Sequence, residues 1–289
     1  MNLAVGFFDG VHLGHRRILS RADAALTFLN HPAEVLSPDR APPLIMTSAD
    51  RLAAVEAALR PGPPGRVRAL DFTPALAAEP PEEFARWLRA GHPSLDALFC
   101  GPDWTFGAGG RGNADFLRGA GFKVETVPFV EIDGAPVSST RIRAAISSGD
   151  MAAAARLLGR PWRVEGIVAR GKGVGRSLGF PTINLRVPEG LVRPPRGVYA
   201  VDTPLGRAVA NWGVAPTMGE RAWSEPVLEV HVVSSAPVAA PERLSVEFRA
   251  FIRPERQFDD DDALRAQIAK DVADAAETFS LWGQEEVDR

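Results

Sequence analysis

The stretch LAVGFFDGVHLGH (residues 3–15) places a short apolar run directly before a glycine-containing turn and the start of a helix. Leu3 to Phe8 predicts a buried parallel strand, and Asp9-Gly10 is a turn signal. A helix that begins at the carboxyl end of such a strand offers free backbone N–H groups and the positive end of its dipole to phosphate. The stretch therefore predicts a nucleotide site at the edge of an α/β sheet.

The flanking sequence continues the alternation of strand and helix. Further apolar runs predict strands over Ala25 to Phe28, Val67 to Phe72 and Leu95 to Cys100. Helical spacing predicts helices over His15 to Ala25, Ser48 to Leu59 (with Ser48 as N-cap) and Pro81 to Ala90. Such alternation is typical of βαβ units on a parallel sheet, so we expect a Rossmann-like α/β domain over residues 1–150.

The pattern changes after about residue 150. Two short helices are predicted over Ser139 to Ser147 and Asp150 to Leu158, the second closed by Gly159. Short apolar segments between turns rich in Gly and Pro then predict strands over Arg163 to Ala169, Gly197 to Thr203, Arg207 to Trp212, Val227 to Val233 and Leu244 to Ile252. They indicate a small β-barrel, which an amphipathic helix over Asp261 to Phe279 follows. We expect this second domain to span residues 158–289.

The bulk composition narrows the classes of function. The chain has 289 residues, of which 45% are hydrophobic, enough for two domains with cores. A net charge of −3 provides no broad basic field, so we expect no binding to nucleic acid or to a membrane surface. A single cysteine, Cys100, favours a reducing cytoplasmic location. Met1 to Phe8 lacks the features of a signal peptide, and no apolar run approaches the ~20 residues that span a bilayer.

Two histidines follow the first predicted strand. His12 and His15 can point from the turn toward bound phosphates and donate hydrogen bonds to charge that develops at an α-phosphate. Gly14 lets a polyphosphate approach the backbone, and Gly6 and Phe8 are predicted to contribute to the same nucleotide site. A metal-binding pair or two surface histidines are the alternatives.

Two further segments of this half carry polar groups. Ser139, Thr140 and Arg141 open a predicted helix, where hydroxyls, backbone N–H groups and a guanidinium suit a mobile anion clamp. An ordinary helix cap is the alternative. Asp103 lies just past a strand end and before a glycine-rich run, where residues that contact substrate collect. A surface loop is the alternative for that segment.

The stretch GKGVGRSLGFPTINL (residues 171–185) is the most informative part of the second half. Closely spaced glycines and two cations form a basic loop that can cover a triphosphate, with nucleotide-binding candidates Gly171, Lys172, Gly175 and Arg176. The spacing does not match a P-loop. Thr182 and Asn184 alternate in an extended segment and therefore share a face. Their hydroxyl and amide oxygens suit Mg²⁺ that keeps waters and nucleotide phosphates.

Glu229 lies within the apolar segment VLEVHVV (residues 227–233). A carboxylate there can serve as a general base toward a primary alcohol. The alternative is an outward-facing residue of an alternating strand, which periodicity alone slightly favours. His231 shares the face of Glu229, and we expect it to have a structural role.

In its first half the sequence resembles the FMN adenylyltransferase module of bacterial bifunctional riboflavin kinase/FAD synthetases. That family carries, in this order, GxFDGxHxGH, a GxDFxFG-type motif and SSTxIR. The resemblance implies an HxGH-type nucleotidyltransferase domain in which His12 and His15 bind and stabilise the ATP phosphates. It also implies a nucleotide and FMN cleft lined by Asp103, Ser139, Thr140 and Arg141, with Asn30 in the loop that usually reads PHP or NHP. The sequence departs from the family in one place, because only eleven residues separate His15 from Thr27.

The second half resembles the riboflavin kinase module of the same family. The motif G-R-x-L-G-F-P-T-x-N matches Gly175 to Asn184, with Ile183 where Ala is usual. The segments GVYA, N-x-G-x-x-P-T and L-E-V-H follow as Gly197 to Ala200, Asn211 to Thr217 and Leu228 to His231. By resemblance, Thr182 and Asn184 bind Mg-ATP, Glu229 activates the ribityl 5′-hydroxyl, and Arg253 lies beside the flavin. The implied fold is a six-stranded Greek-key barrel with a C-terminal helix.

Taken together, the motifs predict phosphorylation of riboflavin to FMN and adenylylation of FMN to FAD, with ATP as co-substrate, Mg²⁺ as cofactor and pyrophosphate released. The alternative is a monofunctional riboflavin kinase with a degenerate adenylyltransferase-like domain, and the short segment after His15 is the feature that favours this alternative. Thr182, Asn184 and Glu229 argue against a flavin sensor without turnover, because a sensor needs no base. The attached kinase module argues against a different HxGH transferase. The sequence leaves the oligomeric state open.

Overall fold

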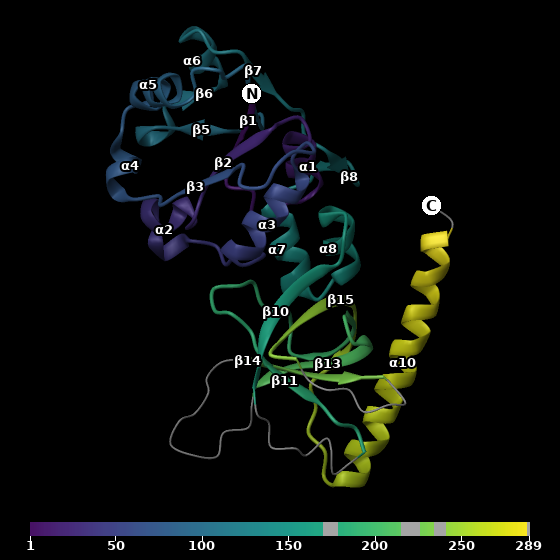
Figure 1. Cartoon of the computed structure of the whole chain (residues 1–289). Coiled ribbons are helices and arrows are strands. Elements are labelled where there is room, and N and C mark those ends of the chain that lie inside the picture. Colours follow the sequence, from purple (N-terminus) through teal and green to yellow (C-terminus); the bar gives the residue numbers. More distant parts are fainter. Residues whose placement is uncertain (170–178, 215–225, 234–240, 288–289) are drawn as a thin grey trace. The chain divides into compact units, whose positions relative to one another are not determined.

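A computed structural model describes residues 1–169, 179–214, 226–233 and 241–287 of the chain (Figure 1). The chain divides into two compact units, Met1–Arg141 and Ile142–Arg289. Each unit has its own sheet and its own apolar core.

The first unit contains a five-stranded sheet in the order β3-β2-β1-β4-β7. Its strands are β1 (Asn2–Val5), β2 (Ala24–Phe28), β3 (Val67–Leu70), β4 (Ala97–Cys100) and β7 (Val124–Thr126). All neighbours pair in parallel, and Ala4 of β1 lies opposite Ala25 of β2 and Phe99 of β4. The chain moves outward from β1 in one direction through β2 and β3 and in the other through β4 and β7. The carboxyl end of β1 is therefore the switch point at which such sheets bind ligands.

Helices cover both faces of this sheet. α1 (Leu13–Leu19) and α3 (Ser48–Ala58) share a core with Ala4, whereas α5 (Pro81–Gly91) and α6 (Ala114–Gly119) share one with Leu3 and Val5. Successive residues of a strand point to opposite faces, so the uninterrupted apolar run of β1 is buried on both sides. The Rossmann-like α/β fold predicted for this half is confirmed.

Several elements of the first unit were not predicted from the sequence. They are β7, α6, α2 (Pro32–Leu36), η1 (Pro38–Arg40), α4 (Pro74–Ala78), β5 (Thr105–Phe106), η2 (Ala108–Gly110), β6 (Gly112–Asn113), β8 (Glu131–Ile132) and β9 (Ala135–Pro136). Apart from α6 they have at most five residues, too few to show a clear apolar period.

Two details of the predicted helices are wrong. The helix predicted over 15–25 is α1, which begins at Leu13 and ends at Leu19. The chain turns after it because the Asp23 carboxylate accepts the backbone N–H of Asn2 at 2.8 Å and ties this segment to β1. The N-cap of α3 is Thr47, whose hydroxyl accepts the backbone N–H of Asp50, whereas the Ser48 hydroxyl donates to the carbonyl of Leu29.

The second unit consists of helices around a closed barrel. α7 (Ser139–Ser148) leads into it, and α8 (Met151–Leu158) has Asp150 as its N-cap and left-handed Gly159 as its C-cap. The barrel order is β10-β11-β14-β13-β12-β15, which confirms the six strands that the resemblance implies; the local pattern gave five strands and an extended segment at β11. Their bounds are β10 (Trp162–Ala169), β11 (Ile183–Arg186), β12 (Gly197–Thr203), β13 (Gly206–Val214), β14 (Pro226–Val232) and β15 (Arg243–Pro254). The final helix, α10 (Asp261–Val287), extends beyond its predicted end.

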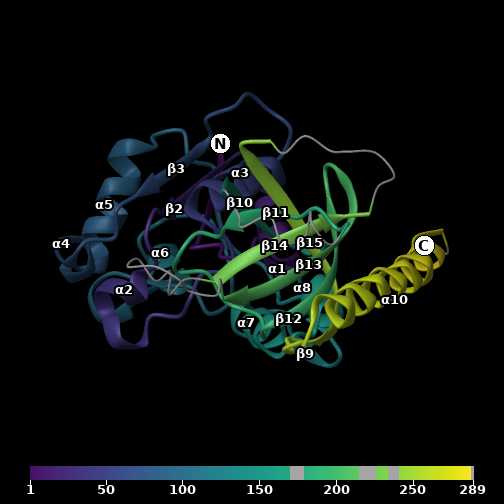
Figure 2. The same ribbon diagram turned by 90° about the horizontal axis from the view of Figure 1, so that it is seen from below.

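Aromatic rings fill the barrel, and α10 covers part of its outside. Phe248 lies 4.8 Å from Trp162 and 5.3 Å from Tyr199 between ring centroids. On the outside, α10 runs beside the barrel strands (Figure 2), and its residues Ala275 and Phe279 form a second core with strand residues. The predicted β-barrel with a C-terminal helix is thus confirmed, and it has two separate apolar surfaces, one inside and one under the helix.

Candidate functional sites

The turn after β1 has an unusual backbone. Phe8 and Val11 both have positive φ, at 59° and 42°, although neither is glycine. Such conformations cost about 1–3 kcal/mol each and gather at functional sites. Asp9 between them is buried, and its carboxylate accepts the backbone N–H of Ile45. The strained turn is therefore tied to a distant loop of the same unit.

His12 and His15 lie against each other in this turn. Their rings stack with centroids 3.6 Å apart, and Nδ1 of His12 accepts the backbone N–H of His15 at 3.3 Å. Among the described residues, Nδ1 of His15 has no hydrogen-bond partner. Burial, together with repulsion from His12, holds the pKa of His15 well below its usual value. His15 is therefore neutral in the free protein near pH 7, with a nitrogen left for a ligand.

The predicted nucleotide residues beside the histidines serve the packing of rings. A Cβ atom at Gly14 would lie 3.1 Å from the His12 ring, and one at Gly6 would lie 2.9 Å from the Phe8 ring. Both glycines therefore leave room for an aromatic neighbour. The Phe8 side chain is buried in the core with its ring edge-on to His15, so only the Phe8 backbone is placed to meet a nucleotide.

The start of α7 reaches the same turn. The Ser139 hydroxyl donates to the carbonyl of Asp9 at 2.9 Å, and Thr140 is exposed beside it. Arg141 was predicted to belong to a mobile anion clamp, and the structure gives its contacts with the protein. Its guanidinium donates to the carbonyls of Ile132, Ala135 and Pro136, and so holds the β8–β9 hairpin.

The two flavin candidates of this unit differ in their surroundings. The Asn30 amide donates to and accepts from the backbone of Phe72, at 3.0 and 2.8 Å, which joins the segments after β2 and β3. This side chain is engaged with the backbone in the free protein, and its contact with flavin stays a prediction. Asp103 is exposed, and a Cβ atom at Gly101 would lie 3.1 Å from its carboxylate.

Sequence reasoning missed Arg51, a fully buried residue of α3. Its guanidinium donates to the carbonyls of Phe7, Phe28 and Leu29 and to the hydroxyl of Thr27, at 2.7–3.0 Å. It also lies 4.1 Å from the Phe7 ring centroid. Arg51 thus fastens the chain beyond β1 to the end of β2. An arginine in a helix with otherwise ordinary polarity gave no signal of this role.

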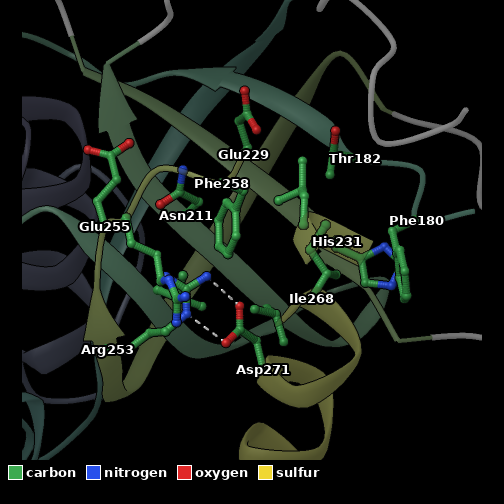
Figure 3. Close-up of a pocket in the computed structure, with 14 residues that line it drawn as sticks. Phe180, Thr182, Asn211, Glu229, His231, Arg253, Glu255, Phe258, Ile268 and Asp271 are labelled. Carbon is green, nitrogen blue, oxygen red and sulfur yellow. Dashed lines mark hydrogen bonds and ion pairs between the residues drawn. The ribbon is translucent and has the colours of Figure 1, made fainter. Parts of the chain in front are cut away.

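The second unit has a pocket on the outside of the barrel, of about 210 Å³ (Figure 3). Ligand pockets usually measure ~300–1,000 Å³, so this volume suits one part of a larger ligand. Strands form one wall and α10 with the segment before it forms the other. The lining residues are Phe180, Thr182, Val198, Val209, Asn211, Glu229, His231, Arg253, Glu255, Arg256, Phe258, Leu264, Ile268 and Asp271.

Strand register brings the predicted kinase residues together. Asn184 of β11 lies directly opposite Glu229 of β14, and Glu229 lies opposite Asn211 of β13. Residues that pair across strands share a face. The neighbours of Glu229 in sequence are fully buried inside the barrel, so this row faces outward. Thr182 lines the same pocket.

Glu229 is half-buried, which agrees with a working carboxylate better than with a solvated strand residue. Burial raises its pKa, and repulsion from Glu255 raises it further. A carboxylate with a raised pKa holds a proton more readily, which suits a general base that works near neutral pH.

The opposite wall contains a bidentate ion pair. Arg253 donates through Nε and an Nη atom to the two carboxylate oxygens of Asp271, both at 2.7 Å. Asp271 is only 2% exposed and also accepts from the Gln267 amide. Arg253 therefore lines the pocket as predicted, but its charge is directed to α10. Figure 3 shows this pair beneath Phe258.

His231 has the structural role expected of it. Its Nδ1 lies 2.9 Å from the carbonyl of Pro181, and its ring is edge-on to Phe180 at 5.3 Å. These contacts hold the segment that leads into Thr182. The predicted loop residues Gly171, Lys172, Gly175 and Arg176 lie outside the described residues, as does the end of the motif at residues 215–217.

Two features concern cofactors and membranes. In the described part of the chain, no group of three or more His, Cys, Asp or Glu side chains could hold a metal ion. Among the helices of that same part, none is long and apolar enough to cross a membrane.

Comparison with known proteins accounts for both units. A family model described as FAD synthetase matches residues 1–141, and one described as riboflavin kinase matches residues 158–279. Proteins named bifunctional riboflavin kinase/FMN adenylyltransferase are similar over nearly their whole length. The one from Pseudomonas fluorescens is 36% identical, covering 94% of this chain and 90% of its own. The one from Haemophilus influenzae is 34% identical, with 96% and 94% covered.

A solved structure shares the architecture. It is a Streptococcus pneumoniae protein described as a macrolide-efflux protein, 27% identical, with a TM-score of 0.80 and coverage of 94% of this chain and 92% of that one. The role in that description applies to the Streptococcus pneumoniae protein alone, and the structural likeness supports the fold of this chain. The two family models and the curated relatives together show that this chain belongs to the bifunctional riboflavin kinase/FMN adenylyltransferase family.

Proposed function

We propose that the barrel unit phosphorylates riboflavin to FMN and that the parallel-sheet unit adenylylates FMN to FAD, both with ATP. Family models for both activities and bifunctional relatives support this pair, and the monofunctional alternative is not favoured. The observation that carries the proposal is the row on the outer face of the barrel, where Asn184 lies opposite Glu229 in strand register and both Glu229 and Thr182 line the pocket. The limits 1–150 and 158–289 for the two activities remain predictions, as does the cytoplasmic location that the single cysteine favours.

In the kinase reaction, Glu229 accepts the proton of the terminal ribityl hydroxyl as that oxygen bonds to the γ-phosphorus of ATP and ADP leaves. The pKa of Glu229 is raised and therefore lies closer to neutral pH than that of an ordinary glutamate, which suits a general base. The apolar side chains of Phe258, Leu264 and Ile268 offer a surface for the flavin ring. Phosphoryl transfer depends chiefly on positioning and charge neutralisation.

Thr182 and Asn184 fit magnesium by their chemistry. A hydroxyl and an amide oxygen are hard donors, and both residues flank Glu229. The described residues offer no carboxylate-rich cage, which agrees with an ion that keeps waters and nucleotide phosphates as its other ligands. When bound, Mg²⁺ neutralises charge on the transferring phosphate.

In the adenylylation reaction, an FMN phosphate oxygen bonds to the α-phosphorus of ATP and pyrophosphate leaves. His12 and His15 lie at the switch point of the sheet, where a nucleotide is expected. His15 keeps a ring nitrogen without a partner among the described residues. Hydrogen bonds from both rings would stabilise charge on the reacting phosphates.

A crossed pair of variants tests both assignments in one protein. Wild-type protein with riboflavin, ATP and Mg²⁺ should yield FMN and then FAD, separated by chromatography. Glu229→Gln should make no FMN from riboflavin but should still make FAD when FMN is supplied. His12→Ala should show the reverse. If wild-type protein makes FMN but never FAD, the monofunctional kinase is the better description.

A further inference from the structure

Asn211 has a buried amide whose oxygen makes no hydrogen bond. Among the residues that the structure describes, its Oδ1 has no partner although it is shielded from solvent. Its neighbours in β13, Ala210 and Trp212, are buried inside the barrel, so Asn211 faces outward into the pocket. A buried acceptor without a donor is unfavourable, so a ligand that supplies the donor would bind more tightly because of it.

The space in front of this amide is kept open by a glycine. Gly213 is the next outward-facing residue of β13, and a Cβ atom there would lie 3.1 Å from Nδ2 of Asn211 and 2.7 Å from Oε1 of Glu255. Any larger residue would displace the amide or the carboxylate. Gly213 is not among the residues with positive φ, so space rather than backbone conformation requires the glycine.

The side chains of this pocket wall favour a ligand that donates hydrogen bonds. Glu229 lies on the neighbouring strand, directly opposite Asn211, and Glu255 lines the same pocket (Figure 3). All three side chains present oxygen acceptors. A ligand group that satisfies them must carry O–H or N–H bonds, and several hydroxyls in a row meet this need.

The order of residues along the row matches the order of groups in the reaction. Asn184 comes first, then Glu229, then Asn211, on the successive strands β11, β14 and β13. Under the proposed function, Asn184 lies with the phosphate donor and Glu229 with the terminal hydroxyl. Directly opposed residues have Cβ atoms about 4.5–5.5 Å apart, so Asn211 lies one short step beyond the reacting hydroxyl, where the rest of the polyol chain continues.

We propose that Asn211 is a specificity-determining residue of the kinase site, which accepts a hydrogen bond from a secondary hydroxyl of the ribityl chain. This inference rests on the proposed riboflavin kinase function. Asn211 thereby distinguishes a polyhydroxylated flavin from one whose side chain carries a terminal hydroxyl alone.

The experiment compares two flavins in two proteins. Riboflavin is compared with 7,8-dimethyl-10-(5-hydroxypentyl)isoalloxazine, which keeps the terminal hydroxyl and lacks the secondary ones. Asn211→Leu, of similar size, removes the acceptor. Binding is followed by flavin fluorescence, and KM and kcat by product formation. Asn211→Leu should weaken riboflavin binding roughly 5- to 100-fold, the range for an unmade buried hydrogen bond, and should change binding of the hydroxypentyl flavin less than about threefold.

Equal weakening of both flavins by Asn211→Leu would indicate a structural effect and overturn the inference, as would unchanged riboflavin binding. If the leucine variant does not fold, Asn211→Ala removes the amide without added bulk, and the same ratio between the flavins decides. Urea unfolding of the barrel unit serves as the folding control for each sample, because FAD formation from supplied FMN reports only on the other unit. A wild-type protein that phosphorylates neither flavin would refute the proposed function itself, whereas normal phosphorylation without discrimination at Asn211 refutes only this inference.

Discussion

Replacing Arg51 with methionine should destabilise the turn of the adenylyltransferase site and leave the stability of the kinase unit unchanged. Methionine keeps much of the apolar stem but none of the four hydrogen bonds at 2.7–3.0 Å. The carbonyls of Phe7 and Leu29 retain hydroxyl donors from Thr27 and Ser48. The Phe28 carbonyl loses its side-chain donor, at about 1–3 kcal/mol for an unsatisfied buried group, and the net loss of charge-assisted bonds brings the total to about 2–5 kcal/mol.

The assay uses the second activity of the same chain as its internal standard. Urea unfolding of the full-length protein, with hydrogen exchange of peptides from residues 1–60, should show the destabilisation in the first unit. FAD formation from FMN should fall, and FMN formation from riboflavin should not. The matched control is Arg68→Met, because Arg68 is exposed on β3 and its guanidinium lies over the Trp87 ring rather than among buried carbonyls. A loss below about 1 kcal/mol for Arg51→Met, or an equal fall of both activities, would refute the fastening role.

Four further outcomes are expected. Glu229→Gln should lower kinase turnover about 10²- to 10⁴-fold with little change in riboflavin affinity. Since Glu255 helps to raise the pKa of Glu229 and a base must be unprotonated, Glu255→Gln should move the acidic limb of kcat/KM to lower pH; an unmoved limb contradicts this. Asp271→Asn should lower the free energy of unfolding of the barrel unit in urea by about 3–5 kcal/mol, because it leaves the half-buried Arg253 without a counter-ion. The double variant Arg253→Met with Asp271→Leu should recover most of that loss. A loss under about 1 kcal/mol for Asp271→Asn argues against the ion pair. ATP binding should raise the pKa of His15 from its lowered value. Titration calorimetry at about pH 6, in buffers of different ionisation heat, should therefore show proton uptake on ATP binding, and His15→Gln should abolish it. Proton uptake that persists in this variant would assign the proton to another group.

The parts of the fold that depend on periodicity were predictable. The central strands of the first unit are continuous apolar runs, and the barrel strands have recognisable turns between them, so both architectures follow from the sequence. β7 was missed because Val124–Thr126 is only three residues long and is recognisable mainly by its pairing with β4. Its place in the sheet comes from tertiary contact, which a local pattern does not contain.

Within the sites, residue type was predictable but partners were not. Strand register places Asn184 opposite Glu229, and Thr182 lines the pocket that Glu229 also lines. The carbonyl partners of Arg141 could not be predicted because they belong to a hairpin too short to show a pattern. Arg51 is 22 to 44 positions away in sequence from the groups that it binds, and no spacing rule connects it to Phe7.

The pocket wall that α10 supplies has a consequence for synthesis on the ribosome. Thr182 precedes Asp271 by 89 positions, and the site needs both walls. A nascent chain whose barrel strands have emerged but whose α10 is still in the exit tunnel has Glu229 exposed on an uncovered strand face. It has no enclosed place for the flavin ring, so we expect unfinished chains not to phosphorylate riboflavin at this site. The first unit can fold earlier, as amino-terminal domains generally do, so the enzyme acquires its FAD-forming step before the step that makes FMN.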